Sequence, residues 1–190
     1  MRTSTQAIVI GASAGAVEAL SAILPALPSD FALPVLIVVH VPPGRTNALV
    51  PLFAAKCRVP VREAQDKEAI EGGAIYFAPP DYHLLVEADH TLTLSADPPV
   101  LHSRPSIDVL FESAADAYGP ALAGVVLTGA NADGAAGLKA IAEAGGLAFV
   151  EDPAEAHVAT MPQAALAACA SARPAPLVEL ASHLIALGAR

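Results

Sequence analysis

The stretch AIVIGASAGAVEAL, residues 7–20, contains the pattern that decides the fold. A short apolar run ends at Gly11, a turn of small residues follows, and a helical pattern begins at Ala16. A buried strand, a glycine-rich turn and a helix in direct succession are typical of α/β proteins with a parallel sheet. Ser13 is the only residue of the turn with a hydroxyl group. It is either a nucleophile or an ordinary turn residue.

Apolar runs and helical patterns continue to alternate along the chain. The sequence predicts strands at residues 7–10, 35–40, 74–78, 123–128 and 147–150. It predicts helices at residues 16–27, 46–56, 106–118, 133–144, 162–170 and 177–187. Ser106 is expected to cap its helix, and Pro51 predicts a late start or a kink in the helix at 46–56. Residues 83–87 and 91–95 predict an antiparallel hairpin. We therefore expect an α/β fold with a mostly parallel sheet and helices on both faces.

The composition restricts the classes of function. Of the 190 residues, 54% are hydrophobic and 15% are charged, so the chain can bury a large core as a single domain over residues 1–190. The net charge is −9 and the basic residues do not cluster, which argues against binding to nucleic acid or anionic lipid. Cys57 and Cys169 are the only cysteines, which fits a reducing cytoplasm. We find no signal peptide and no stretch of about 20 apolar residues, so no membrane insertion is expected.

Three polar residues follow predicted strands at the place where a ligand would bind. In an open parallel sheet, ligands bind beyond the carboxyl ends of the strands, where the strand order reverses. The first strand leads to Ser13, the second ends at His40, and the strand at 123–128 leads to Asp133. These side chains supply a nucleophile, a general base and a carboxylate that orients the base. The sequence therefore predicts a site for acyl transfer.

The chemistry of such a site requires these residue types. A serine hydroxyl attacks an ester when a base removes its proton, which a neutral imidazole does near pH 7. The carboxylate holds the correct tautomer and stabilises the imidazolium. Unpaired N–H groups at the start of a helix favour negative charge on the oxygen of the attacked carbonyl. We expect those donors around Ala14 and Gly15, with a contribution from the loop at Ala130.

Each candidate also has an ordinary structural explanation. Ser13 fits a helix cap, His40 fits a buried core histidine, and Asp133 fits a common Asp-Gly turn. Weaker candidates near strand ends and in loops are Glu151, Asp152 and His157. His83 is expected either to line the cleft or to be solvated. The sequence indicates no partner for His102. His90 and His183 are expected to be exposed. No spacing of His, Cys and acidic residues fits a metal site, so no metal is expected.

Three other interpretations compete for the same turn. Dinucleotide binding requires G-x-G-x-x-G and an acidic end to the second strand, but Ser13 and His40 occupy those positions. GASAG matches the G-x-S-x-G elbow of α/β-hydrolases, yet that family has the order Ser, acid, His and further strands before the elbow. A non-catalytic binding module on the same scaffold would tolerate the loss of a triad residue, and none is lost. A divergent binding module and a generic carboxylesterase stay open as alternatives.

Several motifs in order resemble the catalytic domain of the chemotaxis protein-glutamate methylesterases, the CheB family. They span most of the chain and read IGASAG, VVHVPPG, YFAPPDYHLLVE, HSRPSIDVLFESAA, VVLTGANADGAAGL and EDPAEAHVATMP. The family's catalytic serine, histidine and aspartate fall on Ser13, His40 and Asp133. The resemblance implies a three-layer, doubly wound α/β sandwich with a mostly parallel sheet and an antiparallel hairpin.

The resemblance also implies an activity and a partner. It implies hydrolysis of glutamate methyl esters on the cytoplasmic helices of methylated chemoreceptors, which gives glutamate and methanol, and in some members deamidation of receptor glutamine. No cofactor is implied. The family's usual receiver domain has no room before a first strand at Ala7. We therefore expect an esterase without a receiver domain that is unregulated or differently regulated. The oligomeric state is not indicated.

The chain departs from the family pattern close to the predicted nucleophile and aspartate. The family commonly has Thr at Ala14, Gly at Ala16, Gly-Met-Gly where Gly129 precedes Ala130 and Asn131, and an aromatic residue at Arg45. If the Thr hydroxyl binds the oxyanion, its absence costs about 3 kcal/mol of transition-state stabilisation. Arg45, Arg104 and Lys139 either contact acidic groups of a receptor or are solvated charges. The triad itself is unaffected by these changes.

Overall fold

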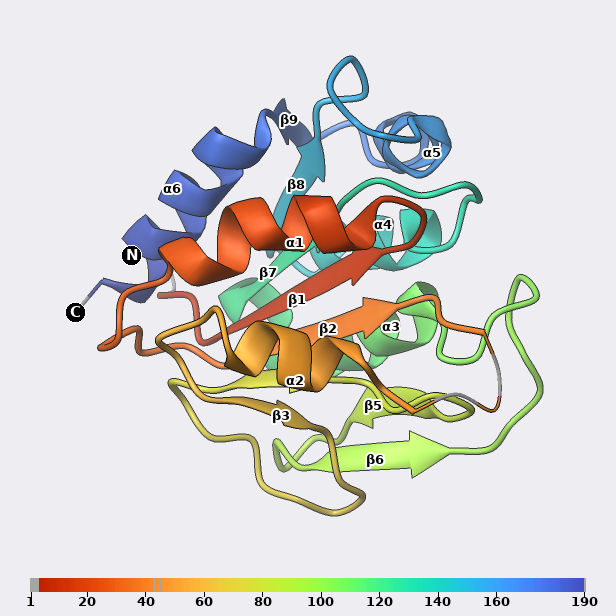
Figure 1. Cartoon of the computed structure of the whole chain (residues 1–190). Coiled ribbons are helices and arrows are strands. Elements are labelled where there is room, and N and C mark those ends of the chain that lie inside the picture. Colours follow the sequence, from red (N-terminus) through yellow and green to blue (C-terminus); the bar gives the residue numbers. More distant parts are fainter. Residues whose placement is uncertain (1–3, 43, 45, 190) are drawn as a thin grey trace.

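A parallel sheet of seven strands lies at the centre of the computed structural model (Figure 1), which describes residues 4–42, 44 and 46–189. Across the sheet the strands are β3 (Val61–Glu63), β4 (Ile75–Phe77), β2 (Val35–Val39), β1 (Ala7–Ala12), β7 (Leu122–Val126), β8 (Leu147–Glu151) and β9 (Arg173–Ala175). Every pairing in this sheet is parallel. The chain extends from β1 toward β2 and later returns to β7 on the other side, so the sheet is doubly wound about β1. A separate antiparallel hairpin consists of β5 (His83–Val86) and β6 (Leu92–Ser95).

Helices cover both faces of the sheet and complete three layers (Figure 1). One face carries α1 (Ala16–Ile23), α2 (Leu49–Ala54) and α6 (Leu177–Gly188). The other carries α3 (Ile107–Tyr118), α4 (Ala135–Glu143), α5 (Thr160–Ala168) and the hairpin. Short 3-10 turns follow α1 at Leu24–Ala26 and α3 at Gly119–Ala121. The predicted fold class, a three-layer doubly wound sandwich with a mostly parallel sheet and a hairpin, is confirmed.

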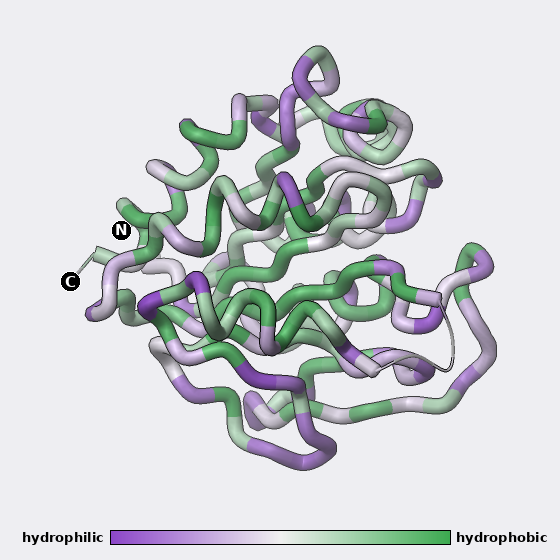
Figure 2. The backbone as a smooth tube through the Cα atoms, in the orientation of Figure 1, coloured by the Kyte–Doolittle hydropathy of each residue, from purple (hydrophilic) through white to green (hydrophobic). Residues whose placement is uncertain are grey.

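Strand β1 shows why the central strands are continuously apolar. Ile8 and Ile10 point into the core beneath α1 and α6, whereas Ala7 and Val9 point into the core beneath α3 and α4. Because successive side chains of a strand point to opposite faces, a strand covered on both faces has no polar side to show. Figure 2 shows this as hydrophobic central strands, with the hydrophilic residues concentrated in loops and on outer helix faces.

Several predicted boundaries shift for identifiable reasons. The helix predicted at 16–27 ends at Ile23, and Pro25 lies in the 3-10 turn that follows it. The helix predicted at 46–56 begins at Leu49, so the predicted late start is confirmed. Pro51 then lies in its first turn, where a missing N–H costs no helical hydrogen bond. The edge strands β3 and β9 were not predicted, because three residues are too few for alternation to show.

The helices of the described part of the chain are too short or too polar to cross a membrane.

Candidate active site

The carboxyl ends of β1, β2 and β7 bring the predicted residues to one edge of the sheet. Ala12 of β1 pairs with Val39 of β2, so Ser13 and His40 are the next residues on neighbouring strands. The His40 N–H donates to the Ala12 carbonyl at 3.2 Å, and the Ser13 N–H donates to the Thr128 carbonyl at 2.9 Å, just beyond β7. This is the point at which the strand order reverses about β1. The fold thus places Ser13 where ligands bind in open α/β sheets.

His40 and Asp133 form a buried pair, although 93 residues separate them in the sequence. The Nε2 atom of His40 lies 2.7 Å from Oδ2 of Asp133, and the side chains are 11% and 0% exposed. The Asp133 carboxylate is hydrogen-bonded to Nε2 of His40. The other ring nitrogen, Nδ1, is therefore free to exchange a proton with a substrate or a nucleophile. The pair has the arrangement of a base and the carboxylate that orients it.

Ser13 lies beside this pair without a hydrogen bond to it. Its side chain is half-buried, and among the described residues no hydrogen bond joins Ser13 Oγ to the His40 ring. The structure therefore brings together two of the three predicted side chains by direct contact and the third by strand register. In free enzymes such a bond is often long and tightens when substrate binds.

The first turn of α3 surrounds the Asp133 carboxylate with donors. Ser106 Oγ and the Asp108 N–H donate to Oδ1, both at 2.9 Å, and the Ile107 N–H donates to Oδ2 at 2.7 Å. Burial alone would raise the pKa of Asp133, but the hydrogen bonds from His40 and from this turn outweigh burial and lower it. Asp133 is therefore a charged carboxylate at neutral pH, as the orienting role requires.

The turn after β1 is held in a shape that exposes backbone donors. Gly15 has a φ of +84°, and a side chain there would also collide with His157. Thr128 Oγ1 donates to the Ala14 carbonyl at 2.7 Å, which ties the turn to β7. In the described part of the chain the N–H groups of Ala14 and Gly15 have no hydrogen-bond partner. Ala130, the third predicted oxyanion residue, is exposed on the loop after β7. These features suit an anion-stabilising role, which stays a prediction.

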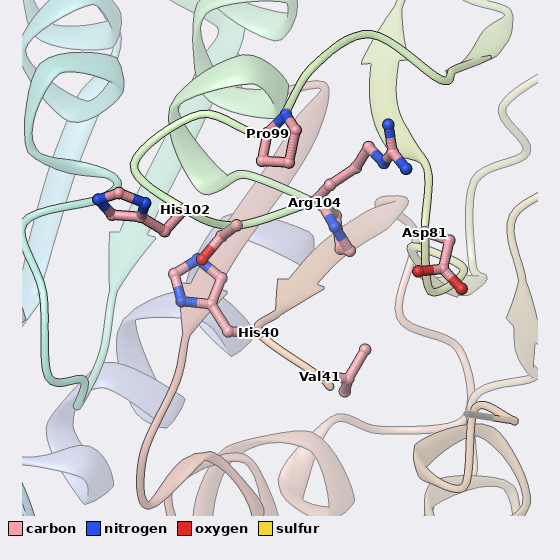
Figure 3. Close-up of a pocket in the computed structure, with 8 residues that line it drawn as sticks. His40, Val41, Asp81, Pro99, His102 and Arg104 are labelled. Atoms are coloured by element: carbon pink, nitrogen blue, oxygen red, sulfur yellow. The ribbon is translucent and has the colours of Figure 1, made fainter. Parts of the chain in front are cut away.

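A pocket of about 130 Å³ opens beside His40 (Figure 3). It is lined by His40 and Val41 after β2, Asp81 before β5, Pro99, and residues 102–105 of the loop before α3. His102, for which the sequence offered no partner, therefore lines the candidate site. Arg104 donates from one guanidinium nitrogen to the carbonyls of Ala96 and Asp97, at 2.7 and 3.0 Å, and so holds this loop together.

The remaining sequence candidates have varied placements. Glu151 is buried and accepts the Thr128 N–H at 2.7 Å, while its burial raises its pKa despite that bond. Lys139 is exposed and lies 3.7 Å from Glu143 of the same helix, which makes it a surface charge. His157 is exposed and lies against Gly15. Arg45 lies outside the described residues.

Two predictions about histidines were wrong. His83 is 1% exposed and neither solvated nor in the lining of the pocket. His90 is half-buried, because its ring stacks on Tyr118 with centroids 4.3 Å apart. His183 is exposed, as expected. In each wrong case the residues that bury the ring are remote in the sequence.

Sequence reasoning missed the residues that support the candidate triad. Ser106 occupies the N-cap position of α3, but its hydroxyl donates to Asp133 in place of capping its own helix. Thr128 and Asp108 were not connected with the site at all, and His83 was considered only as a lining or solvated residue. The available hint was a polar residue at the end or beginning of an apolar run, but that pattern does not identify the partner. Among described residues no cluster of three His, Cys, Asp or Glu could hold a metal ion, and the absence of a cofactor stays a prediction.

Comparisons with known proteins agree with this geometry. The pattern of the CheB methylesterase family matches residues 8–184. A Leptospira interrogans protein, provisionally named protein-glutamate methylesterase/protein-glutamine glutaminase, is 49% identical over 163 residues, which cover 86% of this chain and 84% of that protein. A Burkholderia lata protein named protein-glutamate methylesterase/protein-glutamine glutaminase 3 is 42% identical over 94% of this chain, which spans only 50% of that protein.

A solved structure extends the similarity to the fold. The catalytic domain of the Thermotoga maritima CheB methylesterase superposes with a TM-score of 0.91 at 30% sequence identity. The match covers 97% of this chain and 100% of that domain. With the family pattern extending from β1 into α6, the conclusion is that this chain belongs to the CheB methylesterase family.

Proposed function

We propose that this chain is a serine hydrolase that demethylates glutamate methyl esters on the cytoplasmic helices of chemoreceptors and releases methanol. The observation that carries the proposal is the buried His40–Asp133 pair, whose histidine follows β2 next to Ser13 at the end of the neighbouring strand β1. Family membership and the names of the relatives support the choice of substrate. We place the reaction in the cytoplasm, where those receptor helices lie.

The first half of the proposed reaction acylates Ser13. Nδ1 of His40 accepts the hydroxyl proton as Ser13 Oγ bonds to the ester carbonyl carbon. Asp133 stabilises the imidazolium through Nε2, and the N–H groups of Ala14 and Gly15 stabilise the oxyanion. The bond from the carbonyl carbon to the methoxy oxygen then breaks, and Nδ1 returns its proton to that oxygen, which leaves as methanol.

The second half restores the enzyme. Water attacks the acyl-enzyme while Nδ1 of His40 accepts one of its protons. The bond to Ser13 Oγ then breaks, Oγ recovers the proton, and the product leaves as a glutamate side chain. With an amide in place of the ester, the same steps release ammonia. The glutaminase part of the relatives' names makes this deamidation a second candidate activity.

The test is methanol release from a methylated chemoreceptor fragment. Ser13→Ala is expected to lower turnover by about 10⁴-fold or more. Ser29→Ala is a matched control, since Ser29 is exposed in the turn before β2. A fluorophosphonate probe should label the wild type and Ser29→Ala but not Ser13→Ala. Equal labelling of the Ser13→Ala variant would refute the nucleophile assignment.

The same experiment separates the alternatives. A generic carboxylesterase would hydrolyse small esters but release no methanol from the receptor fragment. A non-catalytic module would bind the fragment without turnover and without probe labelling. If the enzyme hydrolyses another methylated protein but not the receptor fragment, the proposed methylesterase activity holds and the proposed chemoreceptor partner is wrong.

A further inference from the structure

His83 is a buried histidine with both ring nitrogens in use. It is the first residue of β5 and is 1% exposed. Nδ1 accepts the N–H of Ser106 at 3.1 Å, and Nε2 lies 3.1 Å from the carbonyl oxygen of Pro98. A carbonyl only accepts and an amide N–H only donates. The ring must therefore be neutral, with its hydrogen on Nε2.

The two bonds of His83 lead to the two parts of the candidate site. Ser106 donates from its hydroxyl to Oδ1 of Asp133 at 2.9 Å, and Asp133 in turn bonds His40. A chain of hydrogen bonds therefore runs from His83 through Ser106 and Asp133 to the base. Pro98 belongs to the loop whose next residues line the pocket beside His40. His83 is thus bonded to both the support of Asp133 and the wall of the pocket.

The charged form of His83 does not fit this arrangement. A second ring proton would put an Nδ1–H group against the Ser106 N–H, and a buried charge would lack a counterion. In the described part of the chain, no carboxylate forms an ion pair with this ring.

We propose that neutral His83, with its hydrogen on Nε2, is a positioning residue for the hydrolysis. It holds Ser106 so that the Ser106 hydroxyl fixes Asp133, and it holds the pocket loop at Pro98. The proposal rests on the proposed function, because it assigns a role in the reaction of Ser13 and His40. It adds a residue that does not touch substrate and acts through the Asp133 side chain.

Three variants separate positioning from simple packing. His83→Leu fills the site but loses both bonds, and we expect kcat/KM to fall about 10- to 100-fold. His83→Asn keeps an acceptor near the position of Nδ1, and we expect kcat/KM within about fivefold of wild type. His90→Asn is the control, because His90 lies in the turn of the same hairpin and, among the described residues, its ring hydrogen-bonds only the Ala117 carbonyl, at 3.4 Å. Asn also accepts the φ of +61° at that position.

Rescue by asparagine provides a readout that packing would not change. Leu fills the site without an acceptor, whereas Asn has an acceptor but fills the site less well. If packing alone mattered, His83→Leu should keep more activity than His83→Asn. A higher kcat/KM for His83→Leu than for His83→Asn would therefore contradict the proposal, and His90→Asn should keep the wild-type kcat/KM.

A measurement on the unaltered protein decides the matter if the Leu variant fails to fold. Nitrogen-15 NMR of the histidine rings in wild type should show His83 as the neutral Nε2–H tautomer at pH 7. An Nδ1–H tautomer or a charged ring would overturn the proposal, as would a folded His83→Leu variant with wild-type kcat/KM. Failure of the proposed function is separate, since it would appear as no methanol release by the wild type or as full release by Ser13→Ala.

Discussion

Asp108 and Asp133 are two buried aspartates at the starts of the neighbouring helices α3 and α4. The carboxylate of each one accepts hydrogen bonds from the N-terminus of the helix to which the other belongs. Asp133 precedes α4 but accepts the N–H groups of Ile107 and Asp108 at the start of α3. Asp108 is in the first turn of α3 but accepts the N–H groups of Gly134 and Gly137, at 2.9 and 2.7 Å, at the start of α4. The two segments are therefore locked together by reciprocal capping.

The two carboxylates nevertheless have opposite pKa shifts. Burial raises the pKa of Asp108 to about 6, the charge of Asp133 adds to this, and its two N–H donors oppose it. The pKa of Asp133 is lowered in spite of its deeper burial, because His40 and Ser106 donate to it in addition to the helix. A helix N-terminus alone does not keep a buried acid fully charged here. The imidazole of His40 and the hydroxyl of Ser106 make the difference, and of the two aspartates Asp133 is the one that they contact.

The largest effect is expected when Asp133 loses its charge. In Asp133→Asn, an amide group facing Ile107 and His40 would place donors against donors at 2.7 Å. The His40 ring would then adopt the wrong tautomer. We expect kcat for ester hydrolysis to fall about 10⁴-fold, measured as methanol release.

The matching variant at Asp108 is the control for that experiment. Asp108→Asn keeps Oδ1, which accepts both N–H groups from α4, so kcat should stay within about tenfold of wild type. A similar loss of activity in both variants would show that the two acids matter only as helix caps.

The second prediction concerns stability and uses the raised pKa of Asp108. The folded value of about 6 lies above the ordinary value of about 4. Below about pH 4 the group is protonated in both states. Between about pH 4 and about pH 6 the unfolded chain has released this proton while the folded chain still holds it, and above this range both have released it. The unfolding free energy of the wild type should therefore fall relative to Asp108→Asn by up to about 3 kcal/mol.

Urea unfolding of both proteins from acid to neutral pH measures this difference. Asp108→Ala is the control for the hydrogen bonds, since it loses them at every pH and should be about 1 kcal/mol less stable than Asp108→Asn throughout. If the difference in unfolding free energy between wild type and Asp108→Asn does not change with pH, then Asp108 has the same pKa in the folded and unfolded states and the prediction is wrong.

The comparison of the two aspartates also marks the limit of what the sequence predicted. Strand ends are readable because VLIVV and LAGVV are continuous apolar runs. The predicted strand-end positions of Ser13, His40 and Asp133 followed from those runs and from the rule for parallel sheets. The roles assigned to these residues stay predictions. The mostly parallel sheet followed from the alternation of strands and helices, and the hairpin from two short runs around a turn. The order of the strands within the sheet was not predicted.

The reciprocal caps were not predictable, because a carboxylate and its N–H partners come from different segments. Asp108 and Gly134 are 26 residues apart, and nothing local in either segment indicates the other. Ser106 illustrates the problem, since a serine before a helix predicts a cap, and only the packing of α3 against Asp133 redirects its hydroxyl. Buried polar networks depend on where whole elements pack.

The smallest effect is expected for a substitution that removes a side-chain donor from Asp133 and so makes its surroundings more like those of Asp108. Ser106→Ala removes one donor from Oδ1 of Asp133 but leaves the Asp108 N–H on the same atom. We expect kcat to fall about tenfold, since a hydrogen bond to a charged group is worth about 1.5 kcal/mol or more. The pKa of Asp133 should rise, because that hydroxyl helps to lower it, so activity should be lost at a higher pH on acidification. Ser113→Ala on the same helix is the control, since in the described part of the chain the Ser113 hydroxyl bonds only backbone groups, those of Val86, Val109 and Leu110. If Ser106→Ala leaves both kcat and the acid limb unchanged, the hydroxyl contributes nothing to the difference between the two aspartates, and His40 alone must account for it.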